Sequence, residues 1–362
     1  MTSKRIEAAN ISGFLRKKKY FIAFISAGFF GAGLFYNIPG IAMWLGFAFA
    51  AYSVVANDSI QTIGTFIASN RDVKWWLLWL FISAIFLGTV GYSWVTYGGD
   101  VTYQRLASKG LSEAPTEFSY LQVTAPLFLL ILTRLKIPVS TTFLILSCFA
   151  TSATTIAAIV AKSVSGYFIA FATAFVLWFL ITKFFKPRTK EGKPIHPGWR
   201  VAQWASTGTL WSIWLMQDAS NVAVFLPRSL GSGGFLAFSA VVVAGLGWLF
   251  YKRGERIQEV VEEKSRIQDI KAATTVDFIY AAILYIFKIQ SSVPMSTTWV
   301  FVGLLAGREI AKGLTHSNEK RGLREAVAIS ARDFGYVTLG LGISLLLAVL
   351  SNNIIRQSWL GF

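Results

Sequence analysis

The sequence predicts an all-α polytopic membrane protein with about 11–12 hydrophobic segments, arranged as two inverted-topology repeats. Three observations predict this fold class. Of the 362 residues, 54% are hydrophobic and only 14% are charged, whereas a soluble domain carries about 25% charged residues. Two nearly identical strings, 138–142 (PVSTT) and 294–298 (PMSTT), lie 156 positions apart. Each follows an acid in an apolar stretch: Asp58 precedes Ser140 by 82 positions, and Asp218 precedes Ser296 by 78.

Eleven apolar segments are visible along the chain. They are 20–36, 40–69, 75–97, 119–134, 138–160, 165–185, 201–227, 231–251, 272–290, 294–307 and 333–355. A helix needs about 20 residues to cross the hydrocarbon core, and two of these segments, 119–134 and 294–307, are shorter. We therefore expect 119–160 and 272–307 to form re-entrant hairpins that dip into protein rather than lipid, with two full crossings each as the alternative.

The Lys and Arg residues set the expected orientation, because they are enriched in cytoplasmic loops. Each of the segments 1–19, 183–200, 252–271 and 308–332 carries six of them. The loop 98–118 carries only two, against three acids, and suits the outside. If successive segments cross the membrane in alternating directions, the N-terminus lies in the cytoplasm and the C-terminus lies outside. This alternation also makes 40–69 run inward and 201–227 run outward, so the two motif sets have inverted topology.

We expect an integral protein of the cell (inner) membrane, and the segments and loop charges predict its organisation along the chain. It comprises a cytoplasmic N-terminal segment (1–19), a first span (20–36), repeat 1 (37–160), a connecting span with a basic cytoplasmic loop (161–200), an inverted repeat 2 (201–307, with the charged loop 252–271) and a cytoplasmic loop with the last span (308–362). The net charge of +16 belongs to these loops, so we expect a lipid bilayer rather than nucleic acid as partner.

Other function classes lack their usual signatures. The single cysteine, Cys148, allows no disulfide framework and no thiolate metal site. Both histidines, His196 and His316, lie in basic loops, and no nucleophile–base pair is visible. No Walker motif is present, so ATP is not the expected energy source. We therefore expect no enzyme and no cofactor.

The two strings suit the binding of an oxyanion. Proline fixes its own φ and disfavours helix before it, so Pro138 and Pro294 should begin or interrupt helices. The hydroxyls that follow lie at a first turn, where backbone N–H groups lack partners and the helix dipole is positive. The candidate oxyanion ligands are Ser140, Thr141, Thr142, Ser296, Thr297 and Thr298. The alternative is that these hydroxyls only cap a helix or bond a preceding carbonyl.

The two acids stand in matched polar clusters. Each has an amide, then Asp, then two residues, then an amide; the members are Asn57, Asp58 and Gln61 in the first copy, and Gln217, Asp218 and Asn221 in the second. A carboxylate in a membrane segment is costly and marks a functional site. Its oxygens and those of the amides suit a hard cation such as sodium, which we place at Asp58 and Asp218. The alternative for the amides is interhelical hydrogen bonding. Two carboxylates would also repel a bound oxyanion unless cations lay between the carboxylates and the anion.

These residues resemble the inorganic phosphate transporter (PiT) family, whose halves each carry a Gly-Ala-Asn-Asp-x-x-Asn-like signature and a Pro-x-Ser-Thr-Thr string. The resemblance covers about 55–145 and 215–305. It implies a sodium- or proton-coupled phosphate symporter with two inverted repeats, in which the clusters bind cation or substrate and the strings hold phosphate. It also implies a homodimer. This chain departs from the signature at Val55, Gln61 and Gln217. Relatives in the family also carry sulfate.

The sequence thus favours a secondary active transporter that couples inorganic phosphate to a cation, sodium in the first place, by alternating access. A sulfate or proton-coupled oxyanion permease of the same family stays open, as does a repurposed oxyanion channel or sensor. One further acid, Asp277, follows Thr274 by three positions. We expect it to belong to a capping box at the start of a span.

Overall fold

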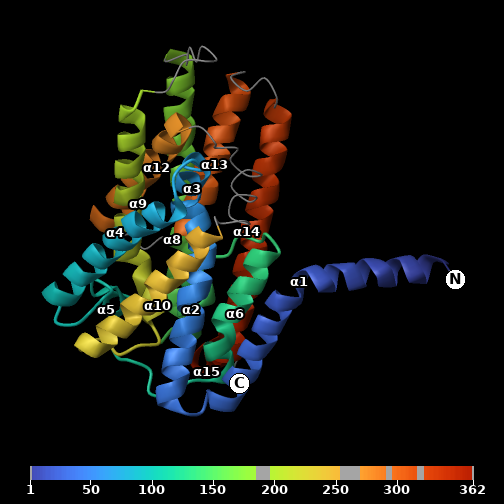
Figure 1. Ribbon diagram of the computed structural model, residues 1–362, viewed down its shortest axis with the longest axis vertical. Coiled ribbons are helices and arrows are strands. Elements are labelled where there is room, and N and C mark those ends of the chain that lie inside the picture. The colour runs from blue at the N-terminus through green and yellow to red at the C-terminus, as the bar shows by residue number, and fades with distance from the viewer. Residues whose placement is uncertain (1, 185–195, 253–269, 291–295, 316–321, 361–362) are drawn as a thin grey trace.

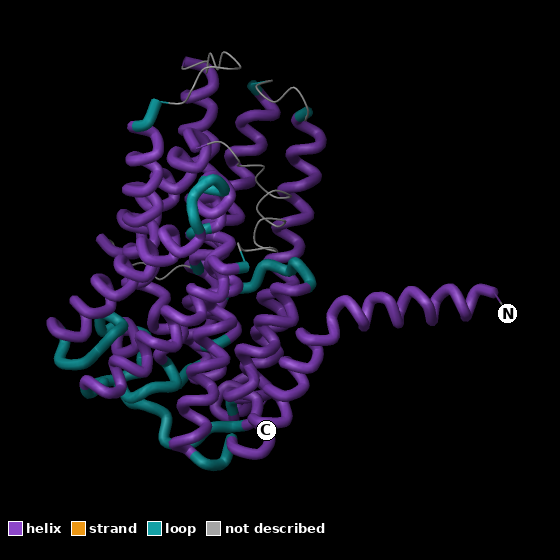
Figure 2. The backbone as a smooth tube through the Cα atoms, in the orientation of Figure 1, coloured by secondary structure: helices purple, strands orange, loops and turns teal. Residues whose placement is uncertain are grey.

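The computed structural model describes residues 2–184, 196–252, 270–290, 296–315 and 322–360 (Figure 1). Pro294 and Met295 of the second string lie outside the described residues, and so do 185–195, 253–269 and 316–321 of the basic loops. Within the described ranges every regular element is helical, as expected. The longest connection that they contain, 97–119, holds only one short helix (Figure 2).

Most of the helices are rich in apolar residues and pack into one bundle, from which the N-terminal part of α1 extends away (Figure 1). The described helices are α1 (Thr2–Phe35), α2 (Pro39–Thr62), α3 (Gly64–Ser69), α4 (Trp75–Thr96), α5 (Arg105–Ser108), α6 (Tyr120–Arg134), α7 (Thr141–Leu144), the 3-10 helix η1 (Leu146–Phe149), α8 (Ala153–Phe184), α9 (Gly198–Ala223), α10 (Ser232–Tyr251), α12 (Ile270–Leu284), the π-helix η2 (Tyr285–Gln290), α13 (Thr297–Leu314), α14 (Leu323–Ser351) and α15 (Asn353–Leu360).

Six of the described helical segments are long and apolar enough to cross a membrane. They lie in α2, α4, α8, α10, α12 with the start of η2, and α14. Their lengths match the thickness of the hydrocarbon core of a bilayer, and several of them expose aliphatic and aromatic side chains. Both features are typical of an integral membrane protein. The protein is therefore a polytopic, all-helical membrane protein.

The two motif helices, α2 and α9, run in opposite directions. Near the start of α2, a Cβ added to Gly46 would lie 2.4 Å from the ring of Phe225, just after the end of α9. At the other end, Asn70 at the end of α3 donates a 2.7 Å hydrogen bond to Gln203 near the start of α9. This antiparallel arrangement is the one that an inverted repeat requires.

Helix α8 differs from the expected segmentation. It is continuous from Ala153 to Phe184, so it crosses residue 160, where the sequence suggested the end of repeat 1, and joins the predicted segments 138–160 and 165–185. The polar residues around Lys162 and Ser163 interrupt the hydropathy but contain no proline that would interrupt the helix. The first string instead occupies a short return segment of α7 and η1.

Helix α13 packs so closely against α8 that its glycines contact the backbone of α8. Gly303 and Gly307 lie four residues apart on α13, and a Cβ added to them would lie 2.3 Å from the Tyr167 carbonyl oxygen and 2.2 Å from that of Phe171. Small residues at this spacing let two membrane helices approach closely. The amide of Ser296 also donates to the Ser163 hydroxyl at 3.0 Å, so α8 positions the second string.

Candidate functional site

The two strings begin helices in the same way. Ser140 and Ser296 are the N-cap residues of α7 and α13, with φ/ψ of −76°/121° and −71°/123°. Each hydroxyl accepts a 3.4 Å hydrogen bond from the amide three residues on, that of Phe143 or Trp299. The helices differ in length, however. Since α7 has four residues and α13 has 18, only α13 presents the positive end of a full helix dipole.

Asp58 lies at the centre of the first cluster and is 1% exposed. Its Oδ1 accepts from Asn57 Nδ2 at 2.7 Å and from Gln61 Nε2 at 3.5 Å. Its Oδ2 accepts from Thr141 Oγ1 at 3.1 Å. Asn57 Nδ2 also donates to the Val139 carbonyl at 3.0 Å. The structure therefore joins the first acid to the first string, 82 positions away.

The second cluster joins Asp218 to the same string through an amide. Asn221 Nδ2 donates to Asp218 Oδ1 at 3.3 Å, to Thr141 Oγ1 at 2.8 Å and to Thr142 Oγ1 at 3.2 Å. Asp218 and Asn221 are both buried. The hydroxyl of Thr141 thus lies between the two aspartates, since it donates to Asp58 and accepts from the amide that contacts Asp218.

The contacts between the repeats are exchanged symmetrically. Gln61 of the first cluster donates from Nε2 to Thr298 Oγ1, the last threonine of the second string, at 3.0 Å. Asn221, at the equivalent position of the second cluster, bonds Thr142, the last threonine of the first string. Each cluster therefore contacts the string of the other repeat, and ten of the twelve candidate residues lie in this one network or cap its helices.

The remaining two candidates make no side-chain hydrogen bond with this network among the described residues. Thr297 contributes its carbonyl, which accepts from the Tyr280 hydroxyl at 3.0 Å. Gln217 is 4% exposed, and its Nε2 has no hydrogen-bond partner in the described part of the chain. The same holds for Oε1 of Gln61. Because a buried polar group without a partner is costly, both glutamines leave an atom for a ligand. These are the two positions where an extra methylene replaces the shorter amide.

A cavity of ≈ 40 Å³ reaches the first cluster, large enough for a few water molecules. Its lining includes Asn57, Gln61 and Thr298 of the network, together with Lys136 and Asp333. Lys136 is exposed and has a φ of 62° in the turn that follows α6. The exposed turn 135–137 therefore borders a cavity that the first cluster also lines.

The connection 97–119 contacts the second cluster. Lys109 Nζ donates a 2.9 Å hydrogen bond to Ser220 Oγ, inside the second motif. Burial lowers the pKa of the Arg105 guanidinium, and the negative charge of Asp218 opposes that change. Arg228 also holds this connection in place, because it donates hydrogen bonds to the carbonyls of Leu111 at 2.8 Å and Glu113 at 2.7 Å. Sequence reasoning missed these roles, since this connection carries few cations.

Asp277 is not a capping residue, contrary to the expectation from its spacing to Thr274. Helix α12 begins at Ile270, so Asp277 lies two turns inside it, and it is 1% exposed. Thr274 instead donates to the Ile270 carbonyl. A carboxyl group this far from a helix start cannot reach the unpaired N–H groups of the first turn. Its partners are described below.

Comparison with solved structures identifies a neighbour for this arrangement. A structure described as "The sodium-dependent phosphate transporter" matches 90% of this chain and 100% of that chain, with a TM-score of 0.58 and 19% identity. The chain has the fold of that transporter. No family model matches the chain. No curated protein matches it either.

The contact of Lys109 with Ser220 gives a testable prediction about closure. Replacing Lys109 with Met should increase the reaction of a cysteine at Ala219, in a Cys148→Ala background, with a membrane-impermeant thiol reagent added to the side of the connection 97–119. A hydrogen bond from a charged group contributes about 1.5 kcal/mol, so we expect a roughly tenfold faster reaction. Lys162→Met, at an exposed lysine of α8, is the control. Equal rates in the three proteins would contradict closure by Lys109.

Proposed function

We propose that this protein is a secondary active transporter that moves inorganic phosphate together with a monovalent cation, sodium in the first place. The observation that carries the proposal is the symmetric exchange in which Gln61 bonds Thr298 and Asn221 bonds Thr142 around two buried aspartates. The shared fold with a sodium-dependent phosphate transporter supports it.

The charges of the site call for a cation. Two like unit charges 4 Å apart repel by about 4 kcal/mol at an effective dielectric constant of 20. An oxyanion beside Asp58 or Asp218 therefore binds well only with a cation between them. The oxygen atoms available for it are hard ligands of the type that sodium prefers: the carboxylates, the unpaired Oε1 of Gln61 and the hydroxyl of Thr141. These residues fit a sodium ion.

The hydroxyls of the strings and the start of α13 fit the anion. Thr297 and Thr298 lie at the first turn of α13, whose dipole and free N–H groups favour negative charge. Thr141 and Thr142 approach from the other repeat. The threonine hydroxyls can reorient to donate to a tetrahedral oxyanion, which matches phosphate and, by the same chemistry, sulfate.

The two sides of the site support alternating access. The first cluster lines a cavity beside the exposed turn 135–137, whereas Lys109 and Arg228 hold the connection 97–119 against the second cluster. A transporter must expose one site to two sides in turn. In an alternating-access cycle the Lys109–Ser220 bond would keep the site closed on that side, and its release would accompany opening there.

Transport by proteoliposomes tests this proposal. Labelled phosphate and labelled sulfate are offered in parallel, with a sodium gradient, a proton gradient or neither imposed. We expect phosphate to accumulate above its external concentration only when a sodium gradient is present. Accumulation of sulfate, or accumulation with the proton gradient alone, would replace the substrate or the coupling ion. A flux that only equilibrates phosphate under every gradient would contradict a symporter and indicate a channel.

A further inference from the structure

Asp277 holds a second position of buried negative charge, outside the network of the two strings. Its Oδ1 accepts a 2.7 Å hydrogen bond from Thr65 Oγ1, and its Oδ2 accepts a 2.5 Å bond from Thr207 Oγ1. Thr65 lies on α3, the short helix that follows α2, and Thr207 lies on α9, so an element from each half of the chain contacts this carboxyl group. Within the described residues, the carboxyl group makes no other hydrogen bond and no ion pair.

Two neutral hydroxyls do not cancel a full negative charge in a membrane-spanning helix, so this group calls for a positive partner. Three bases on α9, α12 and α13 have partners other than Asp277. Arg200 pairs with Asp72 at 2.8 Å, Arg308 pairs with Glu309 at 2.7 Å, and the ammonium of Lys271 lies 5.7 Å from the centre of the Trp199 ring. Among the side chains that the structure describes on α9, α12, α13 and η2, which do not include that of Lys288, the other ionisable groups are Asp218, Tyr280, Tyr285 and Lys312, and none of them bonds Asp277.

We propose that Asp277, Thr65 and Thr207 bind one monovalent cation, either a proton or a sodium ion. The site deepens the proposed transport function, because it would supply a coupling ion, and in that respect it rests on that function. Carboxylate and hydroxyl oxygens suit sodium, and a protonated carboxyl group can donate to either threonine oxygen. Both sources of positive charge therefore fit the same three side chains.

This site is distinct from the one around Asp58 and Asp218. Thr65 follows Asp58 by seven positions and Thr207 precedes Asp218 by 11, about two and three helical turns. At 1.5 Å per residue these separations are roughly 10 Å and 16 Å along the helices. A cation at Asp277 therefore shares no ligand with one at either motif aspartate.

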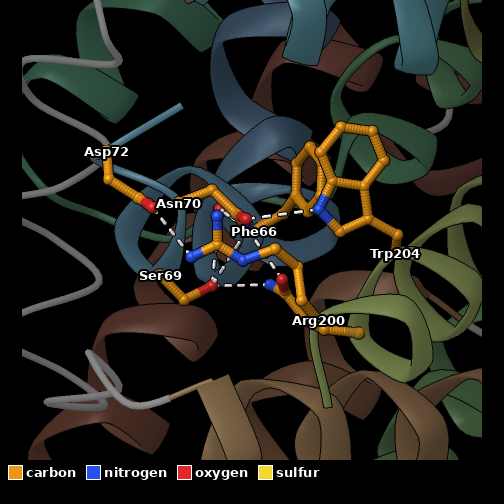
Figure 3. Close-up of polar contacts among 7 residues, drawn as sticks. Phe66, Ser69, Asn70, Asp72, Arg200 and Trp204 are labelled. Carbon is orange, nitrogen blue, oxygen red and sulfur yellow. Dashed lines mark hydrogen bonds and ion pairs between the residues drawn. The ribbon is translucent and has the colours of Figure 1, made fainter. Parts of the chain in front are cut away.

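A polar cluster that includes Ser69, Asn70 and Arg200 lies on the same two elements as Thr65 and Thr207, nearer the surface (Figure 3). Ser69 lies one turn after Thr65, and Gln203 lies one turn before Thr207. Gln203 Nε2 donates to the Ser69 hydroxyl at 2.5 Å, and Asn70 Nδ2 donates to Gln203 Oε1 at 2.7 Å. The next pair outward is Arg200–Asp72, whose side chains are 42% and 63% exposed. The cluster provides polar groups along which a cation can reach Asp277.

A second contact joins Asp277 to the transport site. Tyr280 lies three positions further along α12, and its hydroxyl donates to the Thr297 carbonyl in the second string. Because α12 carries both residues, binding at Asp277 would hold α12 against α3 and α9 while Tyr280 holds the string. Charge at Asp277 and the position of Thr297 are thus linked through one helix.

The test counts bound cations on the purified full-length protein in lipid nanodiscs, without transport. Equilibrium binding of labelled sodium at saturation gives the number of sodium ions per chain. Potentiometric titration from about pH 5 to about pH 9, above the ordinary range of surface carboxyl groups, gives the number of protons. We expect Asp277→Asn to lose one equivalent: a sodium ion if sodium is the ligand, a proton if the carboxyl group is protonated. Unchanged counts of both would overturn the site.

A second variant protects the test against misfolding, and a third provides the control. Thr207→Val keeps the carboxyl group, so it should keep both counts but weaken sodium binding or move the midpoint of the titration. An unchanged affinity and midpoint in Thr207→Val would overturn the role of the hydroxyls. Asp72→Asn, which removes the exposed partner of Arg200, should match the unaltered protein. Loss of one equivalent supports the site even if the chain moves no phosphate, and uptake with unchanged counts rejects the site alone.

Discussion

Replacing Asp58 or Asp218 with Asn is expected to abolish cation-driven phosphate uptake. Asn has nearly the same size, but it removes the charge that would hold the cation. At Asp58 it also weakens bonds from Asn57, Gln61 and Thr141. Hydrogen bonds to a charged group contribute about 1.5–3 kcal/mol each, so the loss of one weakens cation binding by roughly 10- to 150-fold. Initial rates of labelled phosphate uptake into proteoliposomes, at several sodium concentrations, measure this effect.

The control for these variants is the same chemical change at Asp72, whose side chain is 63% exposed and pairs with Arg200 on the surface. An exposed pair contributes about 0–1 kcal/mol, so Asp72→Asn should keep the uptake rate within about twofold. All three proteins must insert and elute as folded species. Sodium-dependent uptake at the normal rate in both Asp58→Asn and Asp218→Asn would remove these carboxylates from the proposed cation site.

Replacing Gly307 with Ala is expected to be the most destabilising single-methyl addition in the described bundle. The added Cβ would lie 2.2 Å from the Phe171 carbonyl oxygen and 2.9 Å from the Phe175 amide nitrogen, both backbone atoms of α8. Backbone of a packed helix cannot move aside as a side-chain end can, so α13 and α8 must separate. Overpacking of this kind costs about 1–3 kcal/mol. Thermal unfolding of the purified protein, followed by tryptophan fluorescence, should show a lower Tm.

Gly342 provides the matched control for Gly307. It also lies inside a helix, α14, but a Cβ added there meets no atom within 4 Å. Gly342→Ala should leave the Tm unchanged or raise it slightly, since Ala favours helix over Gly by about 1 kcal/mol. An equal Tm for Gly307→Ala and Gly342→Ala would show that the close approach of α13 to α8 is not needed for stability.

The sequence predicted the parts of the site that repeat. Because both strings and both acid clusters occur in the same order, their duplication was visible without a structure, and the loop charges gave the opposite directions of α2 and α9. The pairing across the repeats was not visible. Nothing in the spacing says that Gln61 meets Thr298 rather than a residue of its own repeat, since that depends on how the helices pack.

The residues that sequence reasoning missed share a physical cause: their partners are distant in the chain. Asp277 has a local neighbour, Thr274, that suggested a cap, but its bonds come from residues 212 and 70 positions away. Lys109 lies in a connection of low positive charge, and only the fold brings it to Ser220, 111 positions on. The continuous α8 was missed because polar residues lower hydropathy without ending a helix.

The glycine contacts between α13 and α8 determine where the molecule can part. Gly303 and Gly307 pack against the backbone of α8, and the Ser296 amide bonds Ser163. We therefore expect α8, α13 and the second string to move together. Against the first repeat, by contrast, the second string is held at Thr298 by two hydrogen bonds, with Gln61 and with the Val139 carbonyl. Each of these bonds contributes about 1 kcal/mol net, so the contact between the second string and the first repeat is weaker than the packing of α13 against α8. Separation there would release an anion held between the strings without disturbing the helix pair behind it.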